Sequence, residues 1–244
     1  MREGPASDPP PEARFAAVVP AAGLGLRMGS RKLLLPIDGT PILVHALRRL
    51  RMARGCVELV LAVHRDDMDE MLARADQLAV TRVVEGGATR QQSVLAALRA
   101  VSEDIALVLI HDAVRPLVRV AVVEAVAVRA ADCGAAIAAT PSVATVKEVD
   151  GRGFIRSTPP REGLWMAQTP QGFARELAVQ AHEAAARDGF LGTDDAQLVE
   201  RLGRPVAVVR DSPDNVKITT REDLVVAEAI LAWQRREALP EAQH

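Results

Sequence analysis

Short apolar runs alternate with amphipathic segments along the first half of the chain. Runs typical of buried strands occupy 15–20, 57–63, 80–84 and 106–110. Between them, apolar positions at helical spacing predict helices over 42–51, 66–75 and the segment entering 90–98. Because strands that alternate with helices in this way form parallel sheets, we expect an α/β, Rossmann-like fold with helices on both faces of a twisted sheet.

The second half continues this pattern with one interruption. Helices are predicted at 118–131, 173–187, 196–202 and 220–233, and strands at 134–140 and 206–209. The interruption, 141–163, contains prolines, glycines and two short alternating runs, which predict a projecting β-arm. The arm has too few apolar residues for a core, so we expect it to pack on a second subunit as a homodimer, with a mobile surface flap as the alternative.

The ends of the chain differ from its middle in composition. Residues 1–13 contain four prolines and several charges without the apolar stretch of a signal peptide, so we expect a disordered leader. A single domain is predicted over 14–234, followed by a frayed tail over 235–244.

A loop of small residues follows the first strand. Gly23, Gly25 and Gly29 allow sharp turns that let backbone amides converge on an anion, and Arg27 and Lys32 add positive charge. The combination favours a phosphate-rich ligand.

Three alternatives for this loop can be weighed from spacing. A dinucleotide fingerprint requires a third glycine where Met28 stands and an acidic residue about 20 positions later, which is missing here. A P-loop requires Gly-Lys-Ser/Thr after four intervening residues, which is also absent. A turn that merely joins strand to helix remains open, although Arg27 and Lys32 disfavour it.

Two later segments are expected to join this loop. Gly86 and Gly87 precede a helix that carries Ser93, and Asp112 follows the fully apolar strand at 106–110. Since ligands of open α/β sheets bind beyond the carboxyl ends of the strands, the three segments can share one crevice.

The polar clusters also have ordinary explanations. Asp112 could cap a turn with Arg115 as a surface partner, and His111 has no second histidine or cysteine at metal-ligand spacing. Residues 193–195, a hydroxyl followed by two carboxylates, are typical of helix capping.

Composition narrows the possible ligands. The net charge is −2 and tyrosine is absent, which argues against nucleic acid or an anionic membrane and favours a small molecule. Cys56 and Cys133 stand alone, and the longest apolar run is far too short to cross a bilayer, so we expect a cytoplasmic protein.

Taken together, several motifs resemble the 2-C-methyl-D-erythritol 4-phosphate cytidylyltransferase family, of the nucleotide-diphosphosugar transferase type. They cover nearly the whole chain and read PAAGLGLRMG from Pro20, GGATRQQSVL from Gly86, HDAVRP from His111, GLWMAQTPQ from Gly163, TDDA from Thr193 and DNVKIT from Asp214.

The resemblance implies transfer of CMP from CTP to 2-C-methyl-D-erythritol 4-phosphate, with release of pyrophosphate, in non-mevalonate isoprenoid synthesis. It implies Mg²⁺, or another divalent cation, held mainly by the CTP phosphates, with Asp112 beside it. The implied catalytic residues are Arg27, Lys32, Arg161 and Lys217. The implied CTP contacts are Ala21, Ala22, Gly23, Gly25, Gly87, Ser93 and Asp112. The implied acceptor contacts are Arg115, Thr145, Arg161, Thr193 and Lys217.

The sequence departs from the family pattern at three places. The segment between Arg27 and Lys32 is short, Ala88 replaces a commonly acidic residue, and Val114 stands where alanine is usual. Two alternatives therefore stay open: a cytidylyltransferase for another polyol phosphate such as ribitol 5-phosphate, and a nucleotide-binding regulator without turnover.

Overall fold

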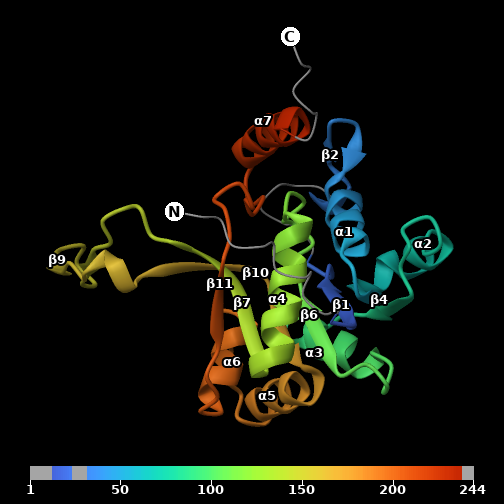
Figure 1. The fold of residues 1–244 in the computed structure, drawn as a ribbon, viewed down its shortest axis with the longest axis horizontal. Helices are drawn as coiled ribbons and strands as arrows, with labels where there is room; N and C mark the ends of the chain where they lie inside the picture. The colour runs from blue at the N-terminus through green and yellow to red at the C-terminus, as the bar shows by residue number, and fades with distance from the viewer. Residues whose placement is uncertain (1–12, 24–31, 238–244) are drawn as a thin grey trace, which may run out of the picture.

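The computed structural model describes residues 13–23 and 32–237, which form one open sheet covered by helices (Figure 1). The strand order is β11-β7-β10-β6-β1-β4-β5. These strands are β1 (Phe15–Pro20), β4 (Cys56–Val63), β5 (Arg82–Glu85), β6 (Leu107–Ile110), β7 (Ala135–Pro141), β10 (Trp165–Ala174) and β11 (Ala207–Arg210). Only β10 runs antiparallel to its neighbours β6 and β7, so the prediction of a mostly parallel sheet is confirmed.

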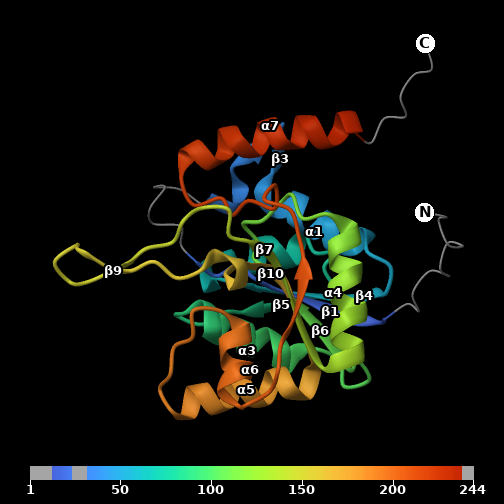
Figure 2. The same cartoon turned by 60° about the vertical axis from the view of Figure 1, so that its left-hand side comes forward.

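Helices cover both faces of this sheet, as predicted (Figure 2). The helices are α1 (Ile42–Met52), α2 (Met68–Ala73), α3 (Arg90–Ala100), α4 (Val120–Cys133), α5 (Arg175–Arg187), α6 (Asp195–Arg201) and α7 (Arg221–Glu237). Alternate residues of β1 point to opposite sides: Ala17 and Val19 pack with α1 and α4, while Ala16 and Val18 pack with α3, α5 and α6. Burial on both faces explains why β1 is an uninterrupted apolar run.

A third, smaller core lies under α7. Ile37, from the short strand β2 (Pro36–Ile37) paired with β3 (Thr40–Pro41), packs there with Ile218 and Leu231. The helix α7 continues through Arg235 to Glu237, so the boundary predicted for the frayed tail, residue 235, lies too early in the chain. These last residues are held by ion pairs of Arg119 with Glu237 and of Arg235 with Asp38. The rest of that tail, 238–244, lies outside the described residues, as do residues 1–12 of the expected leader.

Two smaller boundary predictions are also corrected. Phe173, expected to begin a helix, stays in β10 because that strand pairs with β6 on one side and β7 on the other, and α5 starts at Arg175. The helix expected over 66–75 is shorter, because residues 65–67 form a 3-10 turn and α2 spans Met68–Ala73.

The predicted β-arm is present and projects from the body at the left of Figure 1. It lies between β7 and β10 and contains a small hairpin of β8 (Glu148–Val149) and β9 (Ile155–Ser157). Val143, Phe154 and Ile155 are 83%, 66% and 63% exposed, so the arm's apolar side chains have almost no cover within one subunit.

The position of the site follows from the topology. The crossover from β1 through α1 to β4 uses one face of the sheet, whereas α3 leads from β5 to β6 on the other face. The strand order therefore reverses at β1 and β6, and an open α/β sheet leaves a crevice beyond the carboxyl ends of the strands at such a point. Within the described ranges, no helix is both long and apolar enough to traverse a bilayer.

Candidate active site

A cavity of about 790 Å³ occupies this crevice. Its volume is within the range of small-molecule sites, roughly 300–1,000 Å³. Eight of the residues expected at the site line it: Ala21, Ala22, Gly23, Lys32, Gly87, Ser93, Asp112 and Lys217. The segments expected to converge are thus brought together, although they are widely separated along the chain.

One wall of the cavity is formed by the turn between β5 and α3. A Cβ added at Gly86 would lie 2.5 Å from the Ala22 Cβ and 2.8 Å from the Ser93 Oγ, so only glycine fits there. The Ser93 hydroxyl accepts a hydrogen bond from the Gly87 amide at 3.1 Å and donates to the Thr89 carbonyl at 2.9 Å. The wall is therefore set before any ligand arrives.

Asp112 lies at the centre of a buried ionic group. Its Oδ1 accepts from Arg90 Nε at 2.8 Å, and its Oδ2 lies 2.8 Å from Lys217 Nζ. Burial alone would raise the pKa of Asp112, but Arg90 and Lys217 overcome that effect and hold the pKa well below its ordinary value. Arg90 Nη2 in turn binds Asp195 Oδ2 at 2.8 Å. Asp112 is consequently an anion at neutral pH, with its orientation fixed from two sides.

His111 supports Asp112 from behind the cavity. The side chain is completely buried, and burial lowers its pKa to about 4, so the imidazole is neutral at pH 7. His111 Nε2 is 3.0 Å from the Arg115 carbonyl, which can only accept, so this nitrogen carries the proton. The Thr169 hydroxyl then donates to His111 Nδ1 and accepts from the Asp112 amide, both at 3.0 Å.

The two described lysines of the site are connected through one short segment. Lys32, in the first turn after the glycine-rich loop, donates from Nζ to the Ile218 carbonyl at 2.8 Å. Ile218 directly follows Lys217, so both ammonium groups approach the same side of the cavity.

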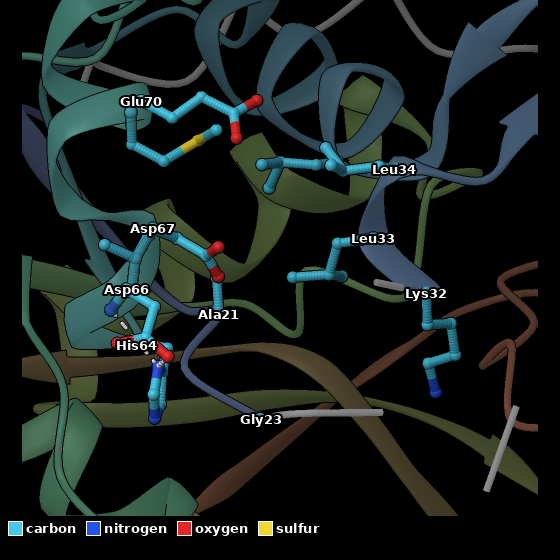
Figure 3. Close-up of a pocket in the computed structure, with 12 residues that line it drawn as sticks. Ala21, Gly23, Lys32, Leu33, Leu34, His64, Asp66, Asp67 and Glu70 are labelled. Atoms are coloured by element: carbon cyan, nitrogen blue, oxygen red, sulfur yellow. Dashed lines mark hydrogen bonds and ion pairs between the residues drawn. The ribbon is translucent and has the colours of Figure 1, made fainter. Parts of the chain in front are cut away.

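A second cavity of about 120 Å³ adjoins the first through Ala21, Gly23, Lys32, Leu33 and His64 (Figure 3). On its other side, Asp66, Asp67 and Glu70 come from the segment that begins α2. The larger cavity thus has a cationic side near Lys217, and this smaller extension has an acidic one.

Four of the expected residues lie elsewhere in the subunit. In the described part of the chain, the cavity lining does not include Arg115, Thr145, Arg161 or Thr193. Arg115 donates to the Asn215 carbonyl at 2.6 Å, and Arg161, in the arm, donates to the Val143 carbonyl at 3.2 Å. The Thr193 amide donates a hydrogen bond to the side-chain oxygen of Gln197, a residue of α6, at 2.8 Å. Gly25 and Arg27 lie outside the described residues.

Arg90 and Asp195 belong to the group of charges at the site, although the sequence pattern did not predict either of them there. Arg90 is one-third exposed, lines the cavity and is the first residue of α3. The capping expected of residues 193–195 is performed by Asp194, which accepts from the Gln197 amide at 3.0 Å, so capping does not account for Asp195. Two adjacent carboxylates before one helix were the available signal, because a single N-cap needs only one.

The described residues fit a metal ion that arrives with a ligand better than a metal cage. Among them, no group of three or more histidine, cysteine or acidic side chains could hold a metal. Asp112 uses two of about four lone-pair directions for Arg90 and Lys217, which leaves about two directions for further bonds. One carboxylate together with ligand phosphates is the usual protein environment of Mg²⁺.

Sequence comparisons agree with this geometry. The family model described as 2-C-methyl-D-erythritol 4-phosphate cytidylyltransferase matches residues 15–233. A protein of that name from Symbiobacterium thermophilum is 44% identical over 225 residues, covering 91% of this chain and 94% of its own. Another from Shouchella clausii is 46% identical over 222 residues, with 89% and 96% covered.

Solved structures show the same likeness. The 4-diphosphocytidyl-2C-methyl-D-erythritol synthase of Anaerococcus prevotii has a TM-score of 0.82 at 32% identity, covering 91% of this chain and 97% of that one. The 2-C-methyl-D-erythritol 4-phosphate cytidylyltransferase of Thermus thermophilus has a TM-score of 0.76 at 36% identity, covering 90% and 99%. Fold and site together define a Rossmann-like nucleotidyltransferase. Within that class, the chain belongs to the 2-C-methyl-D-erythritol 4-phosphate cytidylyltransferase family.

Proposed function

We propose that this chain transfers CMP from CTP to 2-C-methyl-D-erythritol 4-phosphate and releases pyrophosphate, as a step of non-mevalonate isoprenoid synthesis. The observation that carries the proposal is the cavity in which Lys32, Lys217 and the ionised Asp112 meet a glycine-lined wall, in a chain of this family. Two free cysteines suit the reducing cytoplasm, where we expect the protein to work.

The reaction requires alignment more than covalent chemistry from the protein. An oxygen of the acceptor phosphate attacks the α-phosphorus of CTP, the bond to the β-phosphate oxygen breaks, and pyrophosphate leaves with that electron pair. A phosphate is already anionic at neutral pH, so no general base is needed. Catalysis then comes from positioning and from cations placed where charge develops.

Each described residue takes a role that follows from its position. Lys32 stabilises charge on the triphosphate, and Lys217, fixed by Asp112, holds the acceptor phosphate. The wall at Gly87 and Ser93 accepts cytosine and ribose. Asp112 and the triphosphate oxygens would hold Mg²⁺ or another divalent cation, which supplies further neutralisation of phosphate charge. Arg27 is proposed to act beside Lys32.

We further propose that the site is completed by the arm of a second subunit. The arm's exposed apolar side chains favour a homodimer, and Thr145 and Arg161 lie on the arm, away from the cavity of their own subunit. An arm that crosses to the partner would bring Arg161 to the partner's acceptor phosphate. Arg115 and Thr193 are proposed to assist at the acceptor side.

Mixing inactive subunits tests this arrangement. If Arg161 acts across the interface, Arg161→Ala and Lys32→Ala subunits refolded together form heterodimers in which one of the two sites is intact. Random pairing of equal amounts makes about half of the dimers heterodimers, and each of these has one intact site, so about a quarter of the wild-type turnover is restored. If activity stays at the level of the separate variants, Arg161 serves its own subunit and the composite site is wrong.

Pyrophosphate release with defined acceptors tests the reaction itself. CTP and Mg²⁺ are incubated with the protein and either 2-C-methyl-D-erythritol 4-phosphate or ribitol 5-phosphate. We expect release with the first compound at a kcat/KM at least about tenfold higher, since one misplaced hydroxyl contact costs roughly 1–2 kcal/mol. Release only with ribitol 5-phosphate would favour that alternative substrate. No release with either would leave a nucleotide-binding regulator.

A further inference from the structure

A chain of four charged side chains runs from the cavity into the helical layer formed by α5 and α6. Lys217, at the cavity, pairs with Asp112, which pairs with Arg90, which pairs with Asp195, and each contact is 2.8 Å. The far end is the most buried, because the Asp195 side chain is 2% exposed and the Lys217 side chain 45% exposed. The charges alternate and sum to zero.

Asp195 has no other evident reason to be charged. Asp194 already caps α6, and the Ala196 amide donates to Gln171. In the described part of the chain, Asp195 has one titratable partner besides Arg90, which is His182. The His182 Nε2 atom lies 3.2 Å from Asp195 Oδ1. Ionised pairs buried in this way seldom add stability over apolar packing, so a buried carboxylate calls for a further explanation.

The geometry of Arg90 provides one. Its Nε binds Asp112 and its Nη2 binds Asp195, so the planar guanidinium is held at two edges. The bond to Asp195 restrains the orientation of the Arg90 guanidinium, and the guanidinium in turn restrains the Asp112 carboxylate. The second oxygen of that carboxylate then sets the place of the Lys217 ammonium.

We propose that Asp195 is a positioning residue for the acceptor phosphate and acts through Arg90 and Asp112 on Lys217. This inference rests on the role proposed above for Lys217. Asp195 itself does not touch the substrate, since it lies beneath Arg90 and does not line the cavity.

The proposal predicts an effect that falls mainly on the acceptor. Replacing Asp195 by asparagine removes one negative charge from the buried group, which leaves the site more positive towards an anionic triphosphate. CTP should therefore bind no more weakly. The acceptor side should suffer, because Lys217 loses its fixed position and small misplacements of a positioning group reduce rates by up to about 100-fold.

The test is a kinetic comparison of Asp195→Asn with a matched control. Asp188→Asn makes the same chemical change in an exposed Asp–Arg pair with Arg201, also at 2.8 Å, on the same layer. For Asp195→Asn we expect kcat/KM for the acceptor to fall about 10- to 100-fold while the KM for CTP stays equal or falls. Asp188→Asn should change neither. A loss shared equally by both substrates would overturn the proposal.

A double-mutant cycle decides whether the effect passes through Lys217. On a Lys217→Gln background, Asp195→Asn should lower acceptor kcat/KM by less than about threefold, because the group it positions is already gone. Additive losses would overturn the inference, whereas an inactive wild type would overturn the proposed function instead. Should Asp195→Asn fail to fold, Arg90→Lys replaces it in the same cycle, since one ammonium cannot bridge both carboxylates. Additivity there has the same meaning.

Discussion

The neutral, buried His111 predicts a specific dependence of stability on pH. Its pKa is about 4 in the folded protein, lowered first by burial, against an ordinary value of about 6.5 in an unfolded chain. Between these values the unfolded chain binds a proton that the folded protein does not bind. The contribution is therefore present above about pH 6.5 and is lost as the pH falls towards about 4.

The size of this contribution follows from the two pKa values. The gap between about 4 and about 6.5 corresponds to about 3 kcal/mol in total, of which about 2 kcal/mol is lost between pH 7 and about pH 4.5. Asp112 and Asp195, whose pKa values are lowered, lose their contributions only at still lower pH. The interval therefore isolates His111 from these two carboxylates.

Urea unfolding of wild type and His111→Gln at both pH values measures the effect. Glutamine cannot titrate, but its amide can still donate to the Arg115 carbonyl. The Thr169 hydroxyl loses its acceptor, His111 Nδ1, so the variant should be less stable than wild type at pH 7 by about 1–3 kcal/mol. The decisive quantity is the change with pH, which should be about 2 kcal/mol smaller in the variant. Equal losses in both proteins would refute a neutral, buried His111.

The remaining predictions concern the two sides of the nucleotide site. Lys32→Ala should lower kcat about 10²- to 10³-fold with a smaller change in CTP binding, measured by turnover and by calorimetry, and an unchanged kcat would remove Lys32 from catalysis. Gly86→Ala should raise the KM for CTP about tenfold and cost about 1–3 kcal/mol of stability, because the new Cβ overlaps Ala22 and Ser93. Gly151→Ala, where a Cβ meets nothing within 4 Å, is its control, and equal effects in both would contradict this cause.

Much of the fold could be predicted because local patterns encode it. The strand at Phe15–Pro20 is buried on both faces, so every position is apolar and the run is visible in sequence. The arm was recognisable for the opposite reason, since prolines and glycines interrupt a pattern that is otherwise regular. Where local pattern and tertiary pairing disagree, as at Phe173, pairing on both sides of β10 prevails.

The site could be predicted only in part, because its residues are related by contacts and not by spacing. Glycines and cations beyond strand ends indicated where a phosphate ligand would bind. By contrast, Arg90 and Asp195 are 105 positions apart, and in the sequence each resembles an ordinary residue at the start of a helix. Only their shared guanidinium–carboxylate contact shows that α3 and α6 contribute to the same group of charges.

The pairing of Trp165 with Pro141 has a practical consequence for the arm. These residues are direct neighbours on antiparallel strands, so their Cα atoms lie about 5 Å apart. Topologically, β7 and β10 are a hairpin, and everything between them is its loop. A two-residue turn could close the same hairpin with a smaller entropic cost of loop closure. Excision of the arm is therefore expected to leave the residues that line the cavity in place, because none of them lies on the arm, while removing Arg161.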